Sequence, residues 1–199
     1  MPASVAVALA WYFVRAGQLG GAFIMLVGFD CFLRTGEMLS LTFEDVVLDS
    51  LDRGVIKLGH TKTGRRNAAF EASTFNDPLC GRLFRALRAS LPKTTHPEHY
   101  IFTPSVPAFY KMFKQGIEWL GLQDQGFLPY SVRRGGATAF FRATRNMEAT
   151  LDRGRWSSSR VARIYVNDGL AREVEIRLSD AQLAQIATMN SAFQLWLPL

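Results

Sequence analysis

The chain has 199 residues, of which 48% are hydrophobic and 12% aromatic. This composition excludes a disordered chain and predicts one folded domain over residues 1–199. The formal net charge of +6 indicates a polyanionic partner, with nucleic acid ahead of a membrane surface.

The N-terminal part of the chain predicts two apolar helices. They cover residues 4–16 and 18–33 and are separated by Gly17. The second apolar run is too short for a membrane span and contains Asp30, so we expect core helices and no membrane association.

A charged pair and a basic hairpin follow these helices. Arg34 and Glu37 lie three residues apart and share a face if the turn between them is helical, although a surface ion pair of little value is the alternative. Three β-rich segments predict a small antiparallel sheet, at residues 46–48, 54–58 and 67–70. The turn before the third segment presents Lys62, and a basic hairpin tip is more often solvated than catalytic.

Helices dominate the rest of the chain. Leucines that recur every four residues predict an amphipathic helix over residues 75–91. Further helices are expected at about 105–121, 131–143, 146–153 and 170–189. The sequence leaves open whether the last helix packs on its own domain or is exchanged with a neighbouring subunit. Together these elements predict a mainly α fold with a small antiparallel β-sheet (α+β).

The segment from Leu128 to Phe141 combines a helix start, paired arginines and small residues. Pro129 and Ser131 are helix-start signals, with Ser131 as the expected N-cap. The glycines that follow cost a helix roughly 1 kcal/mol each, so they indicate a close approach to another element. A helix start that carries Arg133 and Arg134 suits a phosphate, although a solvated arginine pair is the alternative.

Trp156 and Tyr165 stand nine positions apart in a basic segment that includes Arg160. On one straight helix, nine steps would place the two side chains on opposite faces, roughly 13.5 Å apart along the axis. If both serve one site, the chain must bend between them.

Cysteine and histidine usage argues against a disulfide scaffold and against a metal centre. Cys31 and Cys80 lie in apolar surroundings and are expected to be buried thiols. The three histidines lack the spacing of metal ligands, so we expect no metal and no cofactor.

In their order along the chain, several of these features resemble the catalytic domain of the tyrosine recombinases, the phage-integrase family. The resemblance spans about residues 20–170, and the nine-residue step to the tyrosine is the family's usual spacing. The features that carry it are Arg34-x-x-Glu37, the hairpin Lys62, Tyr130-x-x-Arg133, Gly154-x-Trp156 and Tyr165.

The resemblance implies a site-specific recombinase or integrase that cuts and rejoins DNA. Tyr165 would attack a phosphodiester and form a 3′-phosphotyrosyl intermediate. Arg34 and Arg133 would hold the non-bridging oxygens, and Lys62 would protonate the leaving 5′ oxygen. Trp156 would pack against the phosphate or donate its indole N–H to it.

The resemblance also implies supporting residues and partners. Glu37 would orient Arg34, and Tyr130 would hydrogen-bond the phosphate. The expected partners are double-stranded DNA and further copies of the chain, as a dimer or tetramer on DNA, at an intracellular location. The residues expected to contact DNA are Arg134, Arg65, Arg66 and Arg160.

Two departures from the family pattern keep a second hypothesis open. Tyr130 stands where the family commonly has histidine, and a phenol with a pKa near 10 is a poor general base at neutral pH. Only 33 residues precede Arg34, so we expect the core at about 18–170 to lack the family's N-terminal DNA-clamping domain. The alternatives are an inactive or weakened DNA-binding module derived from a mobile element, and a helical interaction protein without a DNA role.

Overall fold

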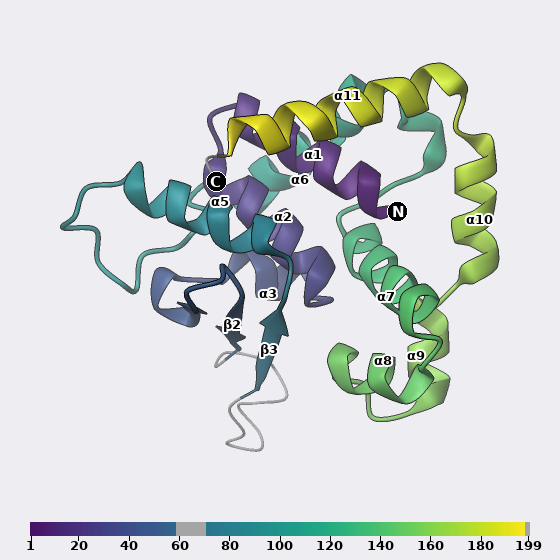
Figure 1. The fold of residues 1–199 in the computed structure, drawn as a ribbon, viewed down its shortest axis with the longest axis horizontal. Coiled ribbons are helices and arrows are strands. Elements are labelled where there is room, and N and C mark those ends of the chain that lie inside the picture. Colours follow the sequence, from purple (N-terminus) through teal and green to yellow (C-terminus); the bar gives the residue numbers. More distant parts are fainter. Residues whose placement is uncertain (59–70, 198–199) are drawn as a thin grey trace.

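The computed structural model of the protein describes residues 1–58 and 71–197 (Figure 1). These residues form a mainly helical fold with a three-stranded antiparallel sheet on one side. The predicted fold class is therefore confirmed. None of the helices within the described ranges is both long and apolar enough to cross a membrane.

Two N-terminal helices form the centre of the molecule. These are α1 (Ala3–Arg15) and α2 (Leu19–Asp30), close to the predicted ranges. Every residue of α2 from Gly20 to Gly28 is buried, because this helix packs against α1 as well as α5 (Pro78–Ala89) and α7 (Tyr130–Thr144). The continuous apolar run of α2 is thus the signature of a helix enclosed by other helices.

The contact between α2 and α7 depends on a glycine. A Cβ atom added at Gly136 would lie only 1.9 Å from the backbone carbonyl oxygen of Phe29. The small residues of α7 therefore serve a close approach, as predicted, and the start of α7 lies directly beside the end of α2.

The sheet has the order β1-β2-β3, with antiparallel pairing throughout. The first two strands, β1 (Val46–Leu48) and β2 (Gly54–Lys57), confirm the predicted segments. The third, β3 (Ala72–Phe75), was not predicted, because its buried positions alternate and one of them is the polar Ser73. The strand expected at 67–70 lies outside the described residues.

The helix predicted over 75–91 is shorter in the structure. Phe75 still belongs to β3, and α5 begins at Pro78, where the side chain of Asp77 accepts the N–H of Leu79. The short helix α3 (Thr35–Leu39) and the 3₁₀ turns η1 (Phe43–Asp45) and η2 (Gln123–Gln125) complete the connections. Two further helices lie near their predicted ranges, α6 (Val106–Trp119) and α8 (Met147–Gly154), whereas α9 (Ser159–Tyr165) had no predicted range.

The prediction of a single C-terminal helix over 170–189 is wrong. The structure has two helices, α10 (Asp168–Arg177) and α11 (Asp180–Trp196). They are separated because the hydroxyl of Ser179 accepts the N–H of Gln182, which starts a new helix. In Figure 1, α11 crosses over α1 at the top of the molecule, where Trp11 and Phe193 stack at 5.7 Å, whereas α10 has no buried residue.

The two cysteines behave as predicted. Cys31 and Cys80 are both buried and free. Burial raises the pKa of the Cys31 thiol to about 12 and that of Cys80 well above its ordinary value. Both side chains therefore contribute to the core as small apolar groups.

Candidate active site

The site is built around the first turns of α7. The helix begins at Tyr130, directly after Pro129, which already has the helical φ of −49°. Ser131 is therefore not the N-cap, and that prediction is wrong; its hydroxyl instead accepts the backbone N–H of Leu128 at 3.1 Å. This start places Arg133 on the side of α7 that faces α2 and α8.

Arg133 is the most unusual side chain of the structure, because it is only 1% exposed. Its Nη1 donates to the carbonyl of Phe32, and its Nη2 donates to the carbonyl of Gly154 at 2.8 Å. The guanidinium carbon lies 5.0 Å from the centre of the Trp156 ring and 5.1 Å from that of the Tyr165 ring. Burial, followed by the nearby arginines, lowers its pKa to about 10, so the group is still charged at neutral pH.

Two residues beside Arg133 have left-handed backbones although neither is glycine. Phe32 has a φ of 50° and follows α2, and Arg155 has a φ of 55° and ends α8. Such conformations cost on the order of 1–3 kcal/mol each and persist only where the surroundings enforce them. Both turns bring a backbone carbonyl to Arg133, one from Phe32 itself and one from Gly154, so the strain is part of what holds the arginine.

The carboxylate of Glu37 pairs with three arginines of the site. Glu37, which is 8% exposed, accepts Nη1 of Arg34 on Oε1 at 2.5 Å. Its Oε2 accepts the backbone N–H of Arg34 and Nη2 of Arg155, both at 2.7 Å, and lies 3.9 Å from Nη1 of Arg133. The predicted pairing of Arg34 with Glu37 is thus observed, but the carboxylate is buried and serves three guanidinium groups.

The two aromatic candidates meet because the chain bends between them. α8 ends at Gly154, and α9 begins after Ser158, whose hydroxyl accepts the N–H of Val161. The rings of Trp156 and Tyr165 stack with centres 4.6 Å apart, and the Tyr130 ring lies 5.6 Å from that of Tyr165. The expected bend is confirmed.

Three buried N–H groups of this cluster have no hydrogen-bond acceptor among the described residues. They are Nε of Arg133, Nε of Arg155 and Nε1 of Trp156. Buried donors are almost always paired in proteins, so unpaired ones require an explanation. The arrangement has more donors and more positive charge than the neighbouring protein oxygens satisfy, which suits an oxygen-rich anion.

No protein-family model and no curated protein matches the sequence. Solved structures do match. XerH site-specific recombinase bound to difH substrate before cleavage aligns with a TM-score of 0.65 and 13% identity, over 94% of this chain and 53% of that one. The post-cleavage complex of XerH on palindromic difH gives 0.63 and 12%, over 83% and 48%. XerA recombinase gives 0.64 and 19%, over 90% and 65%.

The chain has a tyrosine recombinase catalytic-domain-like fold. The resemblance inferred from the sequence is thereby confirmed at the level of the fold, which is what identities of 12–19% show. The chain spans about half to two thirds of the length of these recombinases.

In this recombinase-like fold, the remaining predicted residues are more scattered. Arg134 is half-buried and lines a cavity of about 780 Å³ between α7 and α10. Arg160 is exposed on the first turn of α9. Lys62, Arg65 and Arg66 lie outside the described residues.

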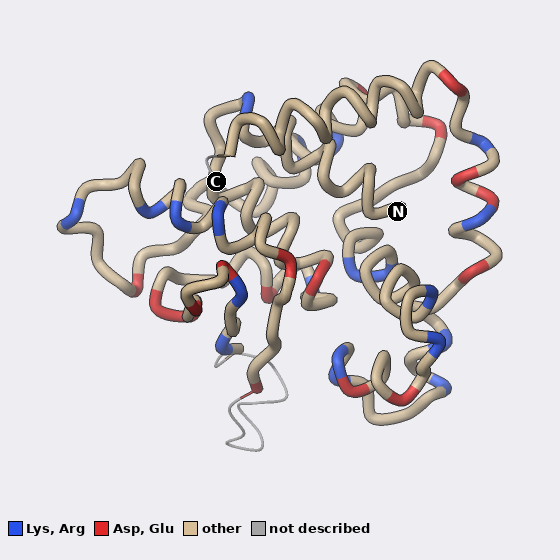
Figure 2. The backbone as a smooth tube through the Cα atoms, viewed as in Figure 1, with Lys and Arg blue, Asp and Glu red and all other residues tan. Residues whose placement is uncertain are grey.

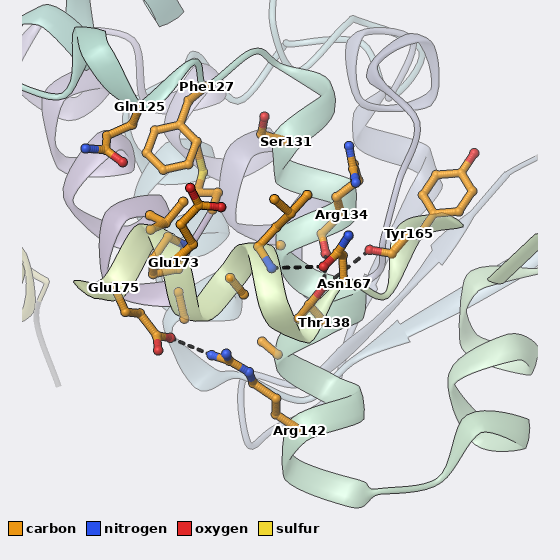
Figure 3. A pocket seen from close by; sticks show the side chains of 18 of the residues that line it. Gln125, Phe127, Ser131, Arg134, Thr138, Arg142, Tyr165, Asn167, Glu173 and Glu175 are labelled. Carbon is orange, nitrogen blue, oxygen red and sulfur yellow. Dashed lines mark hydrogen bonds and ion pairs between the residues drawn. The ribbon is translucent and has the colours of Figure 1, made fainter. Parts of the chain in front are cut away.

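Polar side chains such as Ser131, Arg134 and Glu173 line the cavity beside α7 together with apolar ones (Figure 3). Arg142 pairs with Glu175 across it at 2.5 Å, and the Thr138 hydroxyl donates to the backbone carbonyl of Tyr165 at 3.2 Å. Figure 3 shows the Tyr165 side chain turned away from this cavity. Figure 2 shows acidic and basic residues on α10 and basic residues on α7, and the ion pairs of Arg142 with Asp168 and Glu175 join the two helices.

Two residues of the cluster were missed by reasoning from sequence. Phe32 contributes a carbonyl and a ring that stacks on Trp156 at 6.2 Å, and Arg155 contributes the contact with Glu37. No signal in the sequence separates Arg155 from Arg153 or Arg160, because its role depends on a left-handed turn.

Proposed function

We propose that this chain is the catalytic domain of a DNA-cutting and rejoining enzyme, a tyrosine recombinase that forms a 3′-phosphotyrosyl intermediate on Tyr165. One observation carries the proposal: a buried, charged Arg133 lies against both Tyr165 and Trp156. The likeness of the fold to XerH and XerA supports it.

The reaction is a phosphoryl transfer in two reversible steps. The phenol of Tyr165 loses its proton to solvent and its oxygen attacks a phosphodiester phosphorus. The bond to the 5′ oxygen breaks, and that oxygen takes a proton from Lys62, which regains one from solvent. Rejoining runs the same steps backwards with a new 5′ hydroxyl. The energy of the phosphodiester is conserved in the phosphotyrosine, so the exchange needs neither ATP nor a metal.

Arginines supply the stabilisation of the transition state. Arg34 and Arg133 hold the non-bridging oxygens, whose negative charge grows as the phosphorus becomes five-coordinate. Trp156 adds its unpaired Nε1 as a donor. Glu37 orients the guanidinium of Arg34.

A movement of α9 precedes the attack. In this structure the Tyr165 ring rests on Trp156, and the η nitrogens of Arg133 donate to backbone carbonyls. Moving the Tyr165 ring off Trp156 uncovers the indole N–H and one face of Arg133, and it frees the phenol to reach the phosphate.

Tyr130 acts as a hydrogen-bond donor to the phosphate, where the family commonly uses histidine. Burial and the neighbouring Tyr165 raise the pKa of Tyr130 to about 12. The phenol is therefore neutral at physiological pH and does not act as a general base.

The proposed partner is double-stranded DNA, with self-association on DNA as a dimer or tetramer. The XerH structures contain a DNA substrate, which supports this assignment. Residues 1–199 act as a single catalytic domain, in which Arg134, Arg160 and the hairpin residues Arg65 and Arg66 contact the DNA backbone. In this structure α11 packs on α1 of its own chain.

The second candidate is a DNA-binding module, derived from a mobile element, that no longer cleaves. Two observations favour it over a fully active enzyme. Tyr130 cannot serve as a base, and the η nitrogens of Arg133 are already bonded to the carbonyls of Phe32 and Gly154.

Covalent trapping tests the proposal. The protein and its Tyr165→Phe variant are incubated with nicked and supercoiled DNA and quenched in detergent, and attached protein is quantified. We expect an adduct that Tyr165→Phe abolishes while DNA affinity is nearly unchanged, because only the nucleophilic oxygen is removed. Tyr110→Phe, which alters an exposed tyrosine on α6, is the matched control and leaves the adduct intact.

The outcomes separate the candidates. An adduct that survives Tyr165→Phe would show that another residue is the nucleophile. Salt-dependent DNA binding without any adduct favours the non-cleaving module. Absence of DNA binding would contradict both candidates.

A further inference from the structure

Arg155 is buried in a backbone conformation that favours glycine. It ends α8 with φ 55° and ψ 43°, and its side chain is only 11% exposed. Both features oppose folding, because a left-handed L residue is strained and a buried guanidinium loses its hydration. The contacts of this side chain must therefore offset both costs.

The Arg155 guanidinium lies between the carboxylates of Glu37 and Glu71, and its hydrogen bond goes to Glu37. Nη2 donates to Glu37 Oε2 at 2.7 Å, Nη1 donates to the Cys31 carbonyl at 3.3 Å, and Nε lies 3.6 Å from Glu71 Oε2. The same Oε2 of Glu37 accepts the backbone N–H of Arg34, which leaves Oε1 to accept Nη1 of Arg34. The guanidinium groups of Arg155 and Arg34 thus share the Glu37 carboxylate, with Arg155 on Oε2 and Arg34 on Oε1.

We infer that Arg155 is a positioning residue, which fixes the Glu37 carboxylate so that it holds the Arg34 guanidinium beside Arg133. Two donors on Oε2 keep the carboxylate from turning toward Arg133, whose Nη1 lies 3.9 Å away. The Arg34 side chain is 45% exposed, so this carboxylate is what orders it. The catalytic consequence rests on the proposed function, in which Arg34 and Arg133 bind the phosphate.

Arg155 also contributes to the positive charge of the proposed phosphate site. Arg34, Arg133 and Arg155 place three guanidinium groups around the single carboxylate of Glu37. Loss of Arg155 leaves two guanidinium groups around it, and in a poorly solvated site each charge strongly affects the attraction for an anion. Misplacement of Arg34 and loss of charge both predict weaker phosphate binding.

The test compares Arg155→Gly with Arg145→Gly. Arg145 also ends a helix with a left-handed φ, of 53°, but its side chain is 68% exposed and its ion-pair partner Asp168 is 3.9 Å away. Glycine relieves the backbone at both positions, so neither variant loses the fold through strain. Two quantities are measured: the affinity for inorganic phosphate by calorimetry, and the rate of covalent adduct formation on nicked duplex DNA.

Arg155→Gly is expected to weaken phosphate binding about fivefold and to slow adduct formation about tenfold to a hundredfold, the loss that follows from a small misplacement of a binding group. Arg145→Gly stays within about twofold of the unsubstituted protein in both measurements. In adduct formation, the double variant Arg155→Gly with Glu37→Gln loses no more than Glu37→Gln alone, because the two residues position Arg34 through one contact.

Several results would overturn the inference. They are an unchanged phosphate affinity of Arg155→Gly, losses of adduct formation in Arg155→Gly and Glu37→Gln that simply add, and no phosphate binding by the unsubstituted protein. If no protein forms an adduct, the proposed function fails, and the phosphate affinities alone decide the role of Arg155. If Arg155→Gly does not fold, Arg155→Gln is measured in the same way, and an unchanged phosphate affinity overturns the inference.

Discussion

The two ends of α7 hold their arginines in opposite ways. Near its start, Arg133 is buried beneath aromatic rings, and burial lowers its pKa to about 10. Near its end, Arg142 is 26% exposed and pairs with Asp168 and Glu175. The hydrogen bond to Asp168, together with that to Glu175, raises the pKa of Arg142 above its ordinary value.

The difference lies in the balance of charge. Around the start of α7, three guanidinium groups surround one buried carboxylate, whereas carboxylates from α10 match the arginines at the end. A surplus of buried positive charge is stabilised by an anion, and a matched set needs none. We therefore expect the first cluster, at the start of α7, to bind an anion. The second cluster, at the end of α7, is expected only to hold α10 against α7.

The largest effect is expected from removing the arginine near the start of α7. Arg133→Ala is expected to lower adduct formation about a thousandfold, because a preorganised phosphate ligand is lost. It also leaves two buried carbonyls unpaired and costs about 2–4 kcal/mol of unfolding free energy. Trapping assays and urea unfolding measure both quantities.

Arg142→Ala is the matched control. It breaks partly exposed ion pairs, so its unfolding free energy is expected to change by about 1 kcal/mol or less, with adduct formation nearly unchanged. Comparable losses of adduct formation in the two variants would mean that net charge on α7, and not a defined site, explains the activity.

An intermediate effect is expected from the two carboxylates. Glu37→Gln leaves buried guanidinium groups without their shared counter-charge and is expected to cost about 3 kcal/mol of unfolding free energy. Asp168→Asn is expected to cost much less, because Asp168 is half-exposed and its ion pairs are screened by solvent. Thermal unfolding of both variants measures the difference.

Added sulfate sharpens this comparison. An anion that binds the folded state raises the unfolding temperature, so sulfate is expected to stabilise Glu37→Gln more than Asp168→Asn. Equal stabilisation of the two variants would contradict an anion site at the first cluster.

The smallest effect concerns pH at the start of α7. Tyr130 has a pKa of about 12 in the folded state, against about 10 when unfolded. Between these values only the unfolded state loses the proton, so stability is unaffected below about pH 10 and declines as pH rises toward 12. Tyr130→Phe is expected to remove this part of the decline in chemical unfolding experiments. A slope that is identical in the variant would show that Tyr130 titrates normally.

Features set by local sequence were predictable. The two apolar N-terminal helices, the pairing of Arg34 with Glu37 and the bend between Trp156 and Tyr165 all follow from spacing and composition. The resemblance in motif order predicted the fold correctly even though no family model matches the sequence.

Features set by tertiary contacts were not predictable. The left-handed turns at Phe32 and Arg155 carry no glycine, so the sequence gives no hint of them. The split between α10 and α11 is an exception, because the capping box of Ser179 and Gln182 that starts α11 is a local sequence signature that was missed. β3 has the sequence Ala-Ser-Thr-Phe and buries Ser73 and Phe75, so its residues do not alternate between polar and apolar and show no strand pattern.

The site depends on the absence of a Cβ atom at Gly136. The carbonyl of Phe32 and the guanidinium of Arg133 come from segments 101 residues apart, and they meet because α7 lies directly on the end of α2. Any side chain at position 136 would push α7 away from α2 and separate the Phe32 carbonyl from the Arg133 guanidinium. The geometry of the site thus depends on Gly136, which lies about one helical turn from Arg133 and contacts no ligand.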